Sequence, residues 1–176
     1  MDKIVGEFPR LFALADWLEQ TRVGSAIAEG RYAFPIIEGI HLIGLAAAVG
    51  LLMLVDLRLM GVFLTQVPPR QLHRQLLPYV LGAFGVVVLA GVVLLSSEAT
   101  TVFASPPWPF KMAFIALGGI NALYFEFVSS RRLDALPATG KLPASVRSAG
   151  AISFGLWVLV IICGRLIPYI TSWSSI

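Results

Sequence analysis

The chain has 176 residues, of which 57% are hydrophobic and only 13% are charged, and its mean hydropathy is +0.84. Average soluble domains carry about 25% charged residues, so this composition indicates a lipid-embedded protein and excludes a separate soluble catalytic domain. The formal net charge of +3 is typical of the positive-inside rule, and we expect no nucleic-acid partner. Cys163 is the only cysteine, which excludes an intrachain disulfide and a thiolate metal cluster.

The N-terminal segment, residues 1–30, is acidic and lacks the apolar stretch of a secretory signal peptide. Within it, residues 7–20 place their apolar side chains on one helical face, opposite the charged ones. This pattern predicts an amphipathic helix that lies along the membrane interface, with Trp17 near headgroup level. Its apolar stripe has nothing in its own sequence to pack on, so we expect it to lie on lipid and, if the chain is a subunit of a larger complex, also to contact a neighbouring chain. Thr21 or Ser25 is expected to cap a second short turn.

Four apolar segments follow, each long enough to cross a bilayer, because a span needs about 20 residues. The predicted fold is therefore all-α, a four-transmembrane-helix bundle with an N-terminal amphipathic interfacial helix in a single integral membrane domain. In the second span, Gly82, Gly85 and Gly91 are expected to let another helix approach closely. The predicted spans cover about residues 32–57, 76–97, 110–129 and 148–170.

Aromatic residues mark the connection between the second and third spans, which is expected to be a loop from Ser96 to Pro109. Trp108, together with Phe103 and Phe110, predicts an interfacial aromatic cluster. Lys111 opens the third span beside this cluster. We expect Lys111 to be an interfacial lysine whose ammonium group reaches back to the headgroups.

The basic residues of the loops predict the orientation of the chain. The loops after the first and third spans hold seven basic residues, and the other side holds six. The positive-inside rule then predicts a multi-pass membrane protein with both termini on the outer side, which is the periplasm if the membrane is a bacterial inner membrane. The seven residues are Arg58, Arg70, Arg74, Arg131, Arg132, Lys141 and Arg147.

Glu38 and Arg165 are ionisable residues inside predicted spans, where an unpaired charge is expensive. Glu38 lies about six residues, or ~9 Å, below the start of the first span, and Arg165 lies at a similar depth in the fourth span. Their matching depth predicts an ion pair that clamps the first span to the fourth. Alternatively, this charge binds a ligand propionate or relays protons.

His41 follows Glu38 by three residues and lies at a depth similar to that of Asn121 in the third span. Buried polar groups need hydrogen bonds, so a neutral His41 is expected to bond to Asn121 or to a backbone carbonyl. Alternatively, its free nitrogen ligates the metal of a single haem b or of a chlorophyll-type pigment. Both residues are therefore candidate cofactor-binding residues.

The other histidine, His73, is expected on the inner side of the membrane. About fifteen residues of helix separate His41 from that side, which is over ~20 Å, so the two histidines cannot clamp one haem. A single-histidine site remains open, with Met, Lys111, water or nothing as the second ligand. Glu38 and His41 also form half of a di-iron Glu-x-x-His pattern, but the chain has no second copy of it.

Asp56 and Arg58 are expected near the inner interface, where Arg131, Arg132 and Glu126 are available as partners. The sequence contains no Ser-His-Asp, Walker or zinc-protease pattern. We therefore do not expect an enzyme, and no metal site is predicted apart from the tetrapyrrole.

Three segments carry a family resemblance: EGIHLIGLAAAVGLLMLVDLRLMG from Glu38, PWPFKMAFIALGGINALYFE from Pro107, and Trp157 separated by six residues from GRLIPY. They resemble an uncharacterised family of four-span bacterial inner-membrane proteins, and more distantly the copper-resistance-D and cytochrome b561-type bundles. The distant haem-binding relatives imply a histidine-ligated haem. The matching positions are Glu38, His41, Asp56, Arg58, Lys111, Asn121, Gly164, Arg165 and Tyr169.

Two functions compete on these patterns. We expect a non-catalytic accessory or scaffold subunit of a larger membrane complex, such as an electron-transfer or photosynthetic one, with lipids and other membrane subunits as partners. The alternative is a small membrane redox protein that binds one haem or chlorin through His41. A third function is an ion or proton carrier that uses Glu38.

Overall fold

The computed structural model describes residues 8–129 and 142–170, and its elements within these ranges are all helical. The predicted all-α bundle is thereby confirmed. The two termini, on which the predicted orientation bears, lie outside the described residues, as do Arg131, Arg132 and Lys141. The helices are α2 (Pro9–Glu19), α3 (Arg22–Glu29), α4 (Ala33–Met60), α5 (Pro69–Ala104), α6 (Pro107–Tyr124), the π-helix η1 (Phe125–Ser129) and α8 (Ala144–Leu166).

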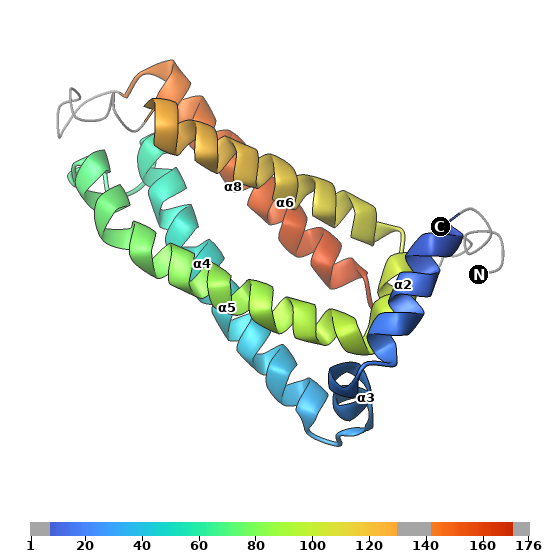
Figure 1. The fold of residues 1–176 in the computed structure, drawn as a ribbon. Helices are drawn as coiled ribbons and strands as arrows, with labels where there is room; N and C mark the ends of the chain where they lie inside the picture. Colours follow the sequence, from blue (N-terminus) through green and yellow to red (C-terminus); the bar gives the residue numbers. More distant parts are fainter. Residues whose placement is uncertain (1–7, 130–141, 171–176) are drawn as a thin grey trace.

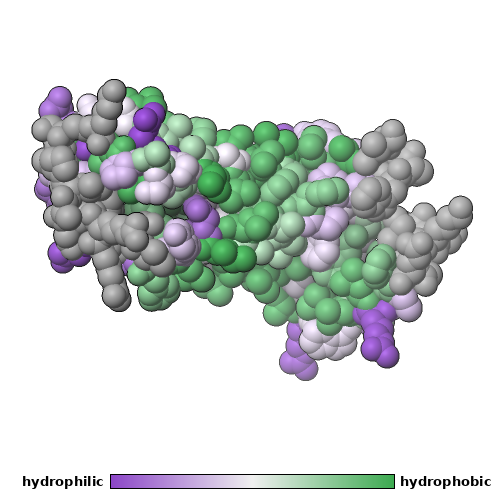
Figure 2. Space-filling view, turned by 90° about the horizontal axis from the view of Figure 1, so that it is seen from above, coloured by the Kyte–Doolittle hydropathy of each residue, from purple (hydrophilic) through white to green (hydrophobic). Residues whose placement is uncertain are grey.

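Four stretches of helix are long and apolar enough to cross a membrane: α4, α5, α6 with the start of η1, and α8. Figure 2 shows a broad apolar band between two ends that carry hydrophilic residues. Large apolar side chains are exposed along these helices, as Ile43 in α4 and Leu89 in α5 illustrate. Such exposure is what a bilayer as solvent requires, since lipid tails are as apolar as the side chains they meet.

The four long helices pack as two connected pairs (Figure 1). The helix α4 lies along α5, α6 lies along α8, and α4 also contacts α8. The helices α2 and α3 lie at the same end of the bundle as the last turn of α8 (Figure 1), and we call this the α2 end. The connection between α4 and α5 lies at the opposite end, which we call the α4–α5 end.

A glycine terminates α4 at the α4–α5 end. Gly61 has a φ of +78°, a left-handed conformation that side chains other than hydrogen rarely adopt. Its N–H donates to the carbonyl oxygen of Arg58 at 3.1 Å, and the N–H of Val62 donates to that of Leu57 at 3.0 Å. These bonds satisfy carbonyl groups that the helix end would leave without partners.

The helix α5 is longer at both ends than the predicted span 76–97. It begins at Pro69, where the missing N–H of proline removes no helical hydrogen bond. At the other end Glu98 is non-helical, with φ −142° and ψ 30°. The hydroxyl groups of Ser96 and Ser97 donate to carbonyl oxygens three residues earlier, a pattern that bends helices. The predicted loop from Ser96 is therefore largely helix with a kink.

The prediction that the N-terminal amphipathic helix has nothing in its own chain to pack on is wrong. Figure 1 shows α2 crossing the end of the bundle beside α5, and Phe12 and Ala15 of α2 are buried there. In addition, Oε1 of Glu19 accepts hydrogen bonds from the backbone N–H and the hydroxyl of Thr100, both at 2.7 Å. Thr100 follows the kink at Glu98 by two residues, so Glu19 caps the part of α5 that continues after the kink.

The second N-terminal helix, α3, is capped as predicted at Thr21. The Thr21 Oγ1 accepts a hydrogen bond from the N–H of Gly24 at 3.1 Å. A Cβ at Gly24 would overlap the carbonyl oxygen of Ser96 in α5. The close approach of α3 to the kinked part of α5 therefore requires glycine at this position.

Candidate functional site

His41 projects from α4 onto the backbone of α5. Its Nδ1 lies 3.0 Å from the carbonyl oxygen of Val87. A carbonyl oxygen can only accept a hydrogen bond, so Nδ1 carries the hydrogen and donates it. In the neutral ring this fixes Nε2 as the nitrogen with the free lone pair, and Nε2 makes no hydrogen bond to the described residues. Of the two partners predicted for His41, the backbone carbonyl is therefore the one observed.

Gly91 provides the space that the His41 ring occupies. A Cβ built on Gly91 would lie 3.1 Å from Cε1 of His41 and 3.5 Å from Nδ1. The helix α5 thus has a notch at Gly91, one turn after the carbonyl group of Val87. By contrast, Gly82 and Gly85 have no neighbouring atom within 4 Å of such a Cβ, so only Gly91 gives the predicted close helix approach within this chain.

Lys111 is half-buried and leans across α8. That its ammonium group reaches the headgroups stays a prediction. Its Cε and Nζ both lie 3.5 Å from the position of a Cβ at Gly164. Lys111 also has electrostatic interactions with His41 and with the thiol of Cys163. Because Gly164 has no side chain, the Lys111 side chain can pack against α8 at this position. We call His41, Val87, Gly91, Lys111 and Gly164 the His41 layer: His41 meets α5 at Val87 and Gly91, and Lys111 meets α8 at Gly164.

The predicted ion pair between Glu38 and Arg165 is wrong for the described residues. Both side chains are exposed, and no salt bridge joins them. Instead, Arg165 donates from Nη2 to the hydroxyl of Tyr169 at 2.9 Å and lies 5.2 Å from the centre of its ring. Figure 1 shows the reason, since α4 diverges from α8 towards its own N-terminal end. Glu38 and Arg165 therefore do not come into contact, although their predicted depths match.

Asn121 does not belong to the His41 layer. Its Nδ2 donates to the carbonyl oxygen of Ala149 at 3.3 Å and so ties α6 to the first turns of α8. Because α8 runs from the α4–α5 end, this bond lies towards the opposite end of the bundle from His41. The candidate role of Asn121 beside a His41-bound cofactor therefore has no geometric support.

The two tryptophans predicted at the interface occupy different settings. Trp108 packs against Phe103 with ring centres 4.6 Å apart, so part of the predicted aromatic cluster forms. Trp17 is 62% exposed on the outer face of α2. The location of both side chains at a lipid interface remains a prediction, because no bilayer accompanies the protein.

His73 lies at the α4–α5 end, far from the His41 layer. Its Nε2 is 3.5 Å from Oε2 of Glu126, and its ring meets Phe125 edge-on with centres 5.4 Å apart. Along α5, His73 precedes Val87 by about fourteen residues, or ~21 Å. This separation agrees with the prediction that the two histidines share no ligand.

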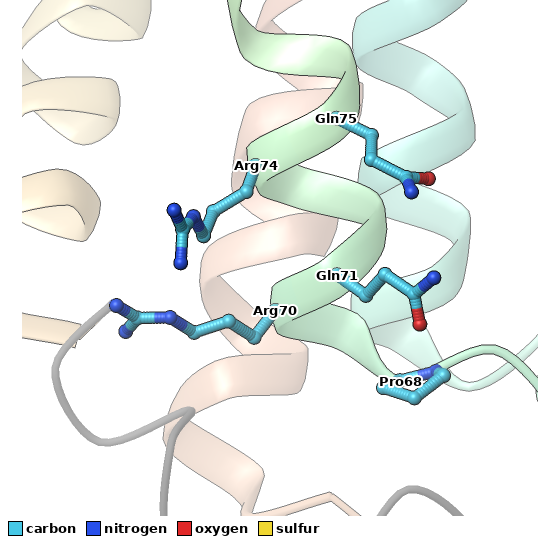
Figure 3. A pocket seen from close by; sticks show the side chains of 5 residues that line it. All are labelled: Pro68, Arg70, Gln71, Arg74 and Gln75. Atoms are coloured by element: carbon cyan, nitrogen blue, oxygen red, sulfur yellow. The ribbon is translucent and has the colours of Figure 1, made fainter.

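A shallow hollow of about 570 Å³ lies beside His73 at the start of α5. Figure 3 shows its two arginine side chains pointing to one side of the helix and its two glutamines to the other. The lining residues are Pro68, Arg70, Gln71, Arg74 and Gln75.

Asp56 and Arg58 are more deeply buried than their expected place near the interface implied, with exposed fractions of 3% and 1%. Arg58 donates from Nε to the carbonyl oxygen of Val67 at 2.6 Å. The Oδ2 of Asp56, in contrast, has no hydrogen-bond partner among the described residues. Sequence patterns gave no sign of this buried carboxyl group beyond the presence of an acid near the end of a span.

These features define a multi-pass helical membrane protein in whose bundle His41 holds one ring nitrogen on the α5 backbone and keeps the other without a hydrogen bond to the described residues. Within the described ranges, no group of three or more His, Cys, Asp or Glu side chains is placed to hold a metal ion. The chain belongs to a family of unknown function, DUF6644, which matches residues 15–170. The predicted membership of an uncharacterised family is thereby confirmed, while the more distant likeness to the copper-resistance-D and cytochrome b561-type bundles gains no support. Searches of curated proteins and of solved structures found no match.

Proposed function

We propose that this chain is a small membrane redox protein that binds one tetrapyrrole, a haem b or a chlorophyll-type pigment, through Nε2 of His41. The hydrogen bond from Nδ1 to the Val87 carbonyl oxygen carries the proposal. Histidines that ligate metals nearly always donate their other ring N–H to such an acceptor, which fixes the tautomer and the ring orientation. His41 has this arrangement.

Lys111 supplies the charge that such a ligand requires. Haem carries two propionate groups, and a buried anion needs a positive partner. The Lys111 ammonium group interacts electrostatically with His41 and makes no hydrogen bond or ion pair with the described residues. We therefore assign it as the partner of one propionate.

Titration of the detergent-purified protein with haem tests the ligand. We expect a Soret band that saturates at one haem per chain and disappears in His41→Ala. His73→Ala is the matched control and should bind like the parent, because His73 lies at the other end of the bundle beside Glu126. A parent without a saturable band, or a His41→Ala variant with an unchanged one, would overturn the proposal.

The role of Lys111 has its own test. Lys111→Gln should weaken the binding of haem and leave the binding of haem dimethyl ester unchanged, because the ester has no propionate charge. Equal weakening for both ligands would show that Lys111 only supports the shape of the bundle.

A second candidate function, that of a non-catalytic accessory subunit in a larger membrane complex, rests on a different observation. Gly82 and Gly85 of α5 face open space, and small residues at such spacing let a helix of another chain approach. Gly85→Leu should reduce the size of the complex extracted from native membranes by a mild detergent. Leu81→Ile, a conservative change at an exposed position of the same helix, is the control.

The location proposed for either function is the bacterial inner membrane, with both termini in the periplasm. The slight excess of basic residues in the loops after the first and third spans supports this orientation. Reporter fusions at each terminus test it, since a periplasm-dependent phosphatase should be active at both.

A further inference from the structure

Asp56 is a residue of α4 that is buried where α4 packs on α8, in the half of the bundle opposite the His41 layer. The two helices nearly touch there, because a Cβ at Gly150 would lie 2.9 Å from the carbonyl oxygen of Asp56. The residues around this level form an apolar cluster that excludes water. Its members include Val55, Leu59, Leu72, Phe125, Val146 and Ala149.

Few polar groups accompany this carboxyl group. The hydroxyl of Ser153 in α8 is within hydrogen-bonding reach of Asp56. The Oδ2 of Asp56 and the Nε1 of Trp157 are the buried side-chain polar atoms without a partner in the described part of the chain. Trp157 follows Ser153 by four residues, so these side chains share one face of α8. The Nε1 of Trp157 faces α6, 3.5 Å from the position of a Cβ at Gly118, so among the described side chains Ser153 is the polar neighbour of Asp56.

The charged groups of the surrounding helices are engaged elsewhere. Arg58 donates to the carbonyl oxygen of Val67, and Arg147 donates to that of Met60 at 3.3 Å. His73 of α5 and Glu126 of η1 contact each other at 3.5 Å. None of these groups has an electrostatic interaction with Asp56, whose polar influence comes from Ser153.

A buried carboxylate without a positive partner is strongly penalised by the loss of its hydration, and acidic groups inside spans usually mark ion or proton sites. A bound metal cation would need several oxygen ligands, whereas the described surroundings offer Ser153 and backbone carbonyls. A proton needs only Oδ2 itself. We propose that Asp56 is a proton-binding site within the bundle.

Asp56 exchanges its proton with water at the α4–α5 end. Asp56 lies four residues from the end of α4 at Met60, which corresponds to ~6 Å of helix. The carboxylate takes a proton from hydronium to give the carboxylic acid and water, and the reverse step returns it. This inference does not depend on the tetrapyrrole, since His41 lies about fifteen residues, or over ~20 Å, further along the same helix.

Infrared spectroscopy of the full chain in detergent at pH 7 tests the site. A protonated carboxylic acid gives a carbonyl-stretching band above the amide region, and ionised carboxylates do not. We expect this band in the parent, its loss in Asp56→Asn and its retention in Glu38→Gln, the matched change of the other acid in α4. In D₂O the band should move to lower frequency as the proton exchanges.

Three results would overturn the proposal: no acid band in the parent, a band that persists in Asp56→Asn, or a band that disappears when sodium replaces potassium. The last result would identify a metal-cation site instead. Asp56→Asn is isosteric and should melt within a few degrees of the parent. If it does not fold, Ser153→Ala takes its place, and an unchanged band frequency in that variant would show that the acid observed is not Asp56.

Discussion

The carboxylate of Glu19 closes the break in α5 by accepting two hydrogen bonds from Thr100, both at 2.7 Å. A charged acceptor at a helical N–H is the geometry of an N-cap, although here the cap comes from a residue 81 positions earlier. The same contact fastens α2 to the bundle. One side chain therefore supports both the kinked end of α5 and the docking of the N-terminal helix.

Glu19→Ala should lower the stability of the folded bundle by ~1–2 kcal/mol, the usual effect of removing a capping side chain. A lower melting temperature in detergent and faster proteolysis between α2 and α3 would report the loss. Glu29→Ala is the control, because Glu29 is exposed at the end of α3. Equal effects of the two changes would show that the cap contributes nothing.

Gly91→Ala should displace the imidazole of His41, since the added Cβ would lie 3.1 Å from Cε1. Overpacking of this kind destabilises by ~1–3 kcal/mol, and the hydrogen bond to Val87 should weaken with it. Gly85→Ala in the same helix meets no atom within 4 Å and should leave the melting temperature unchanged. In a haem titration, only the change at Gly91 should weaken binding.

Gly150→Ala should separate α4 from α8 near the α4–α5 end. Its Cβ would lie 2.9 Å from the carbonyl oxygen of Asp56 and 3.0 Å from Cβ of Leu59, and neither atom belongs to the far end of a flexible side chain. We expect a loss of about 2 kcal/mol or more in the free energy of unfolding. Gly155→Ala in the same helix has open space and is the control. A denaturant titration of both variants would contradict the packing if their midpoints coincide.

Arg165→Ala should change stability by less than ~1 kcal/mol, because exposed polar pairs contribute little and Arg165 contacts Tyr169 in the turn that follows its own helix. A double-mutant cycle with Glu38→Gln should be additive within about 0.5 kcal/mol, as expected for residues that do not touch. A coupling energy well above that value would show that Glu38 and Arg165 do form an ion pair between α4 and α8.

The four spans were predictable because hydropathy and length determine them almost alone. The ends of the helices were harder to predict. The predicted second span begins near residue 76, but α5 begins at Pro69, because a polar stretch of helix can continue beyond the apolar core of the bilayer. Counting residues from the predicted start of each span placed His41 and Asn121 at one depth, but Asn121 bonds to Ala149 near the start of α8. The direction in which a side chain points could not be predicted either, since it depends on helix rotation and crossing angle. For that reason the pair Glu38 and Arg165 failed, and the partnership of His41 with Val87 was foreseen only as some backbone carbonyl.

The contact between Glu19 and Thr100 also has a consequence for the order of events during synthesis. A ribosome adding about 5–20 residues per second releases Glu19 roughly 4–16 s before Thr100, given the 81 residues between them. During this interval α2 has formed no bond to α5 and exposes Phe12 and Ala15, which are buried in the finished bundle. An amphipathic helix in that situation is stabilised by the lipid headgroup region. The bilayer surface thus serves as the temporary partner of α2 until the end of α5 emerges, and α2 then leaves the lipid to pack on α5.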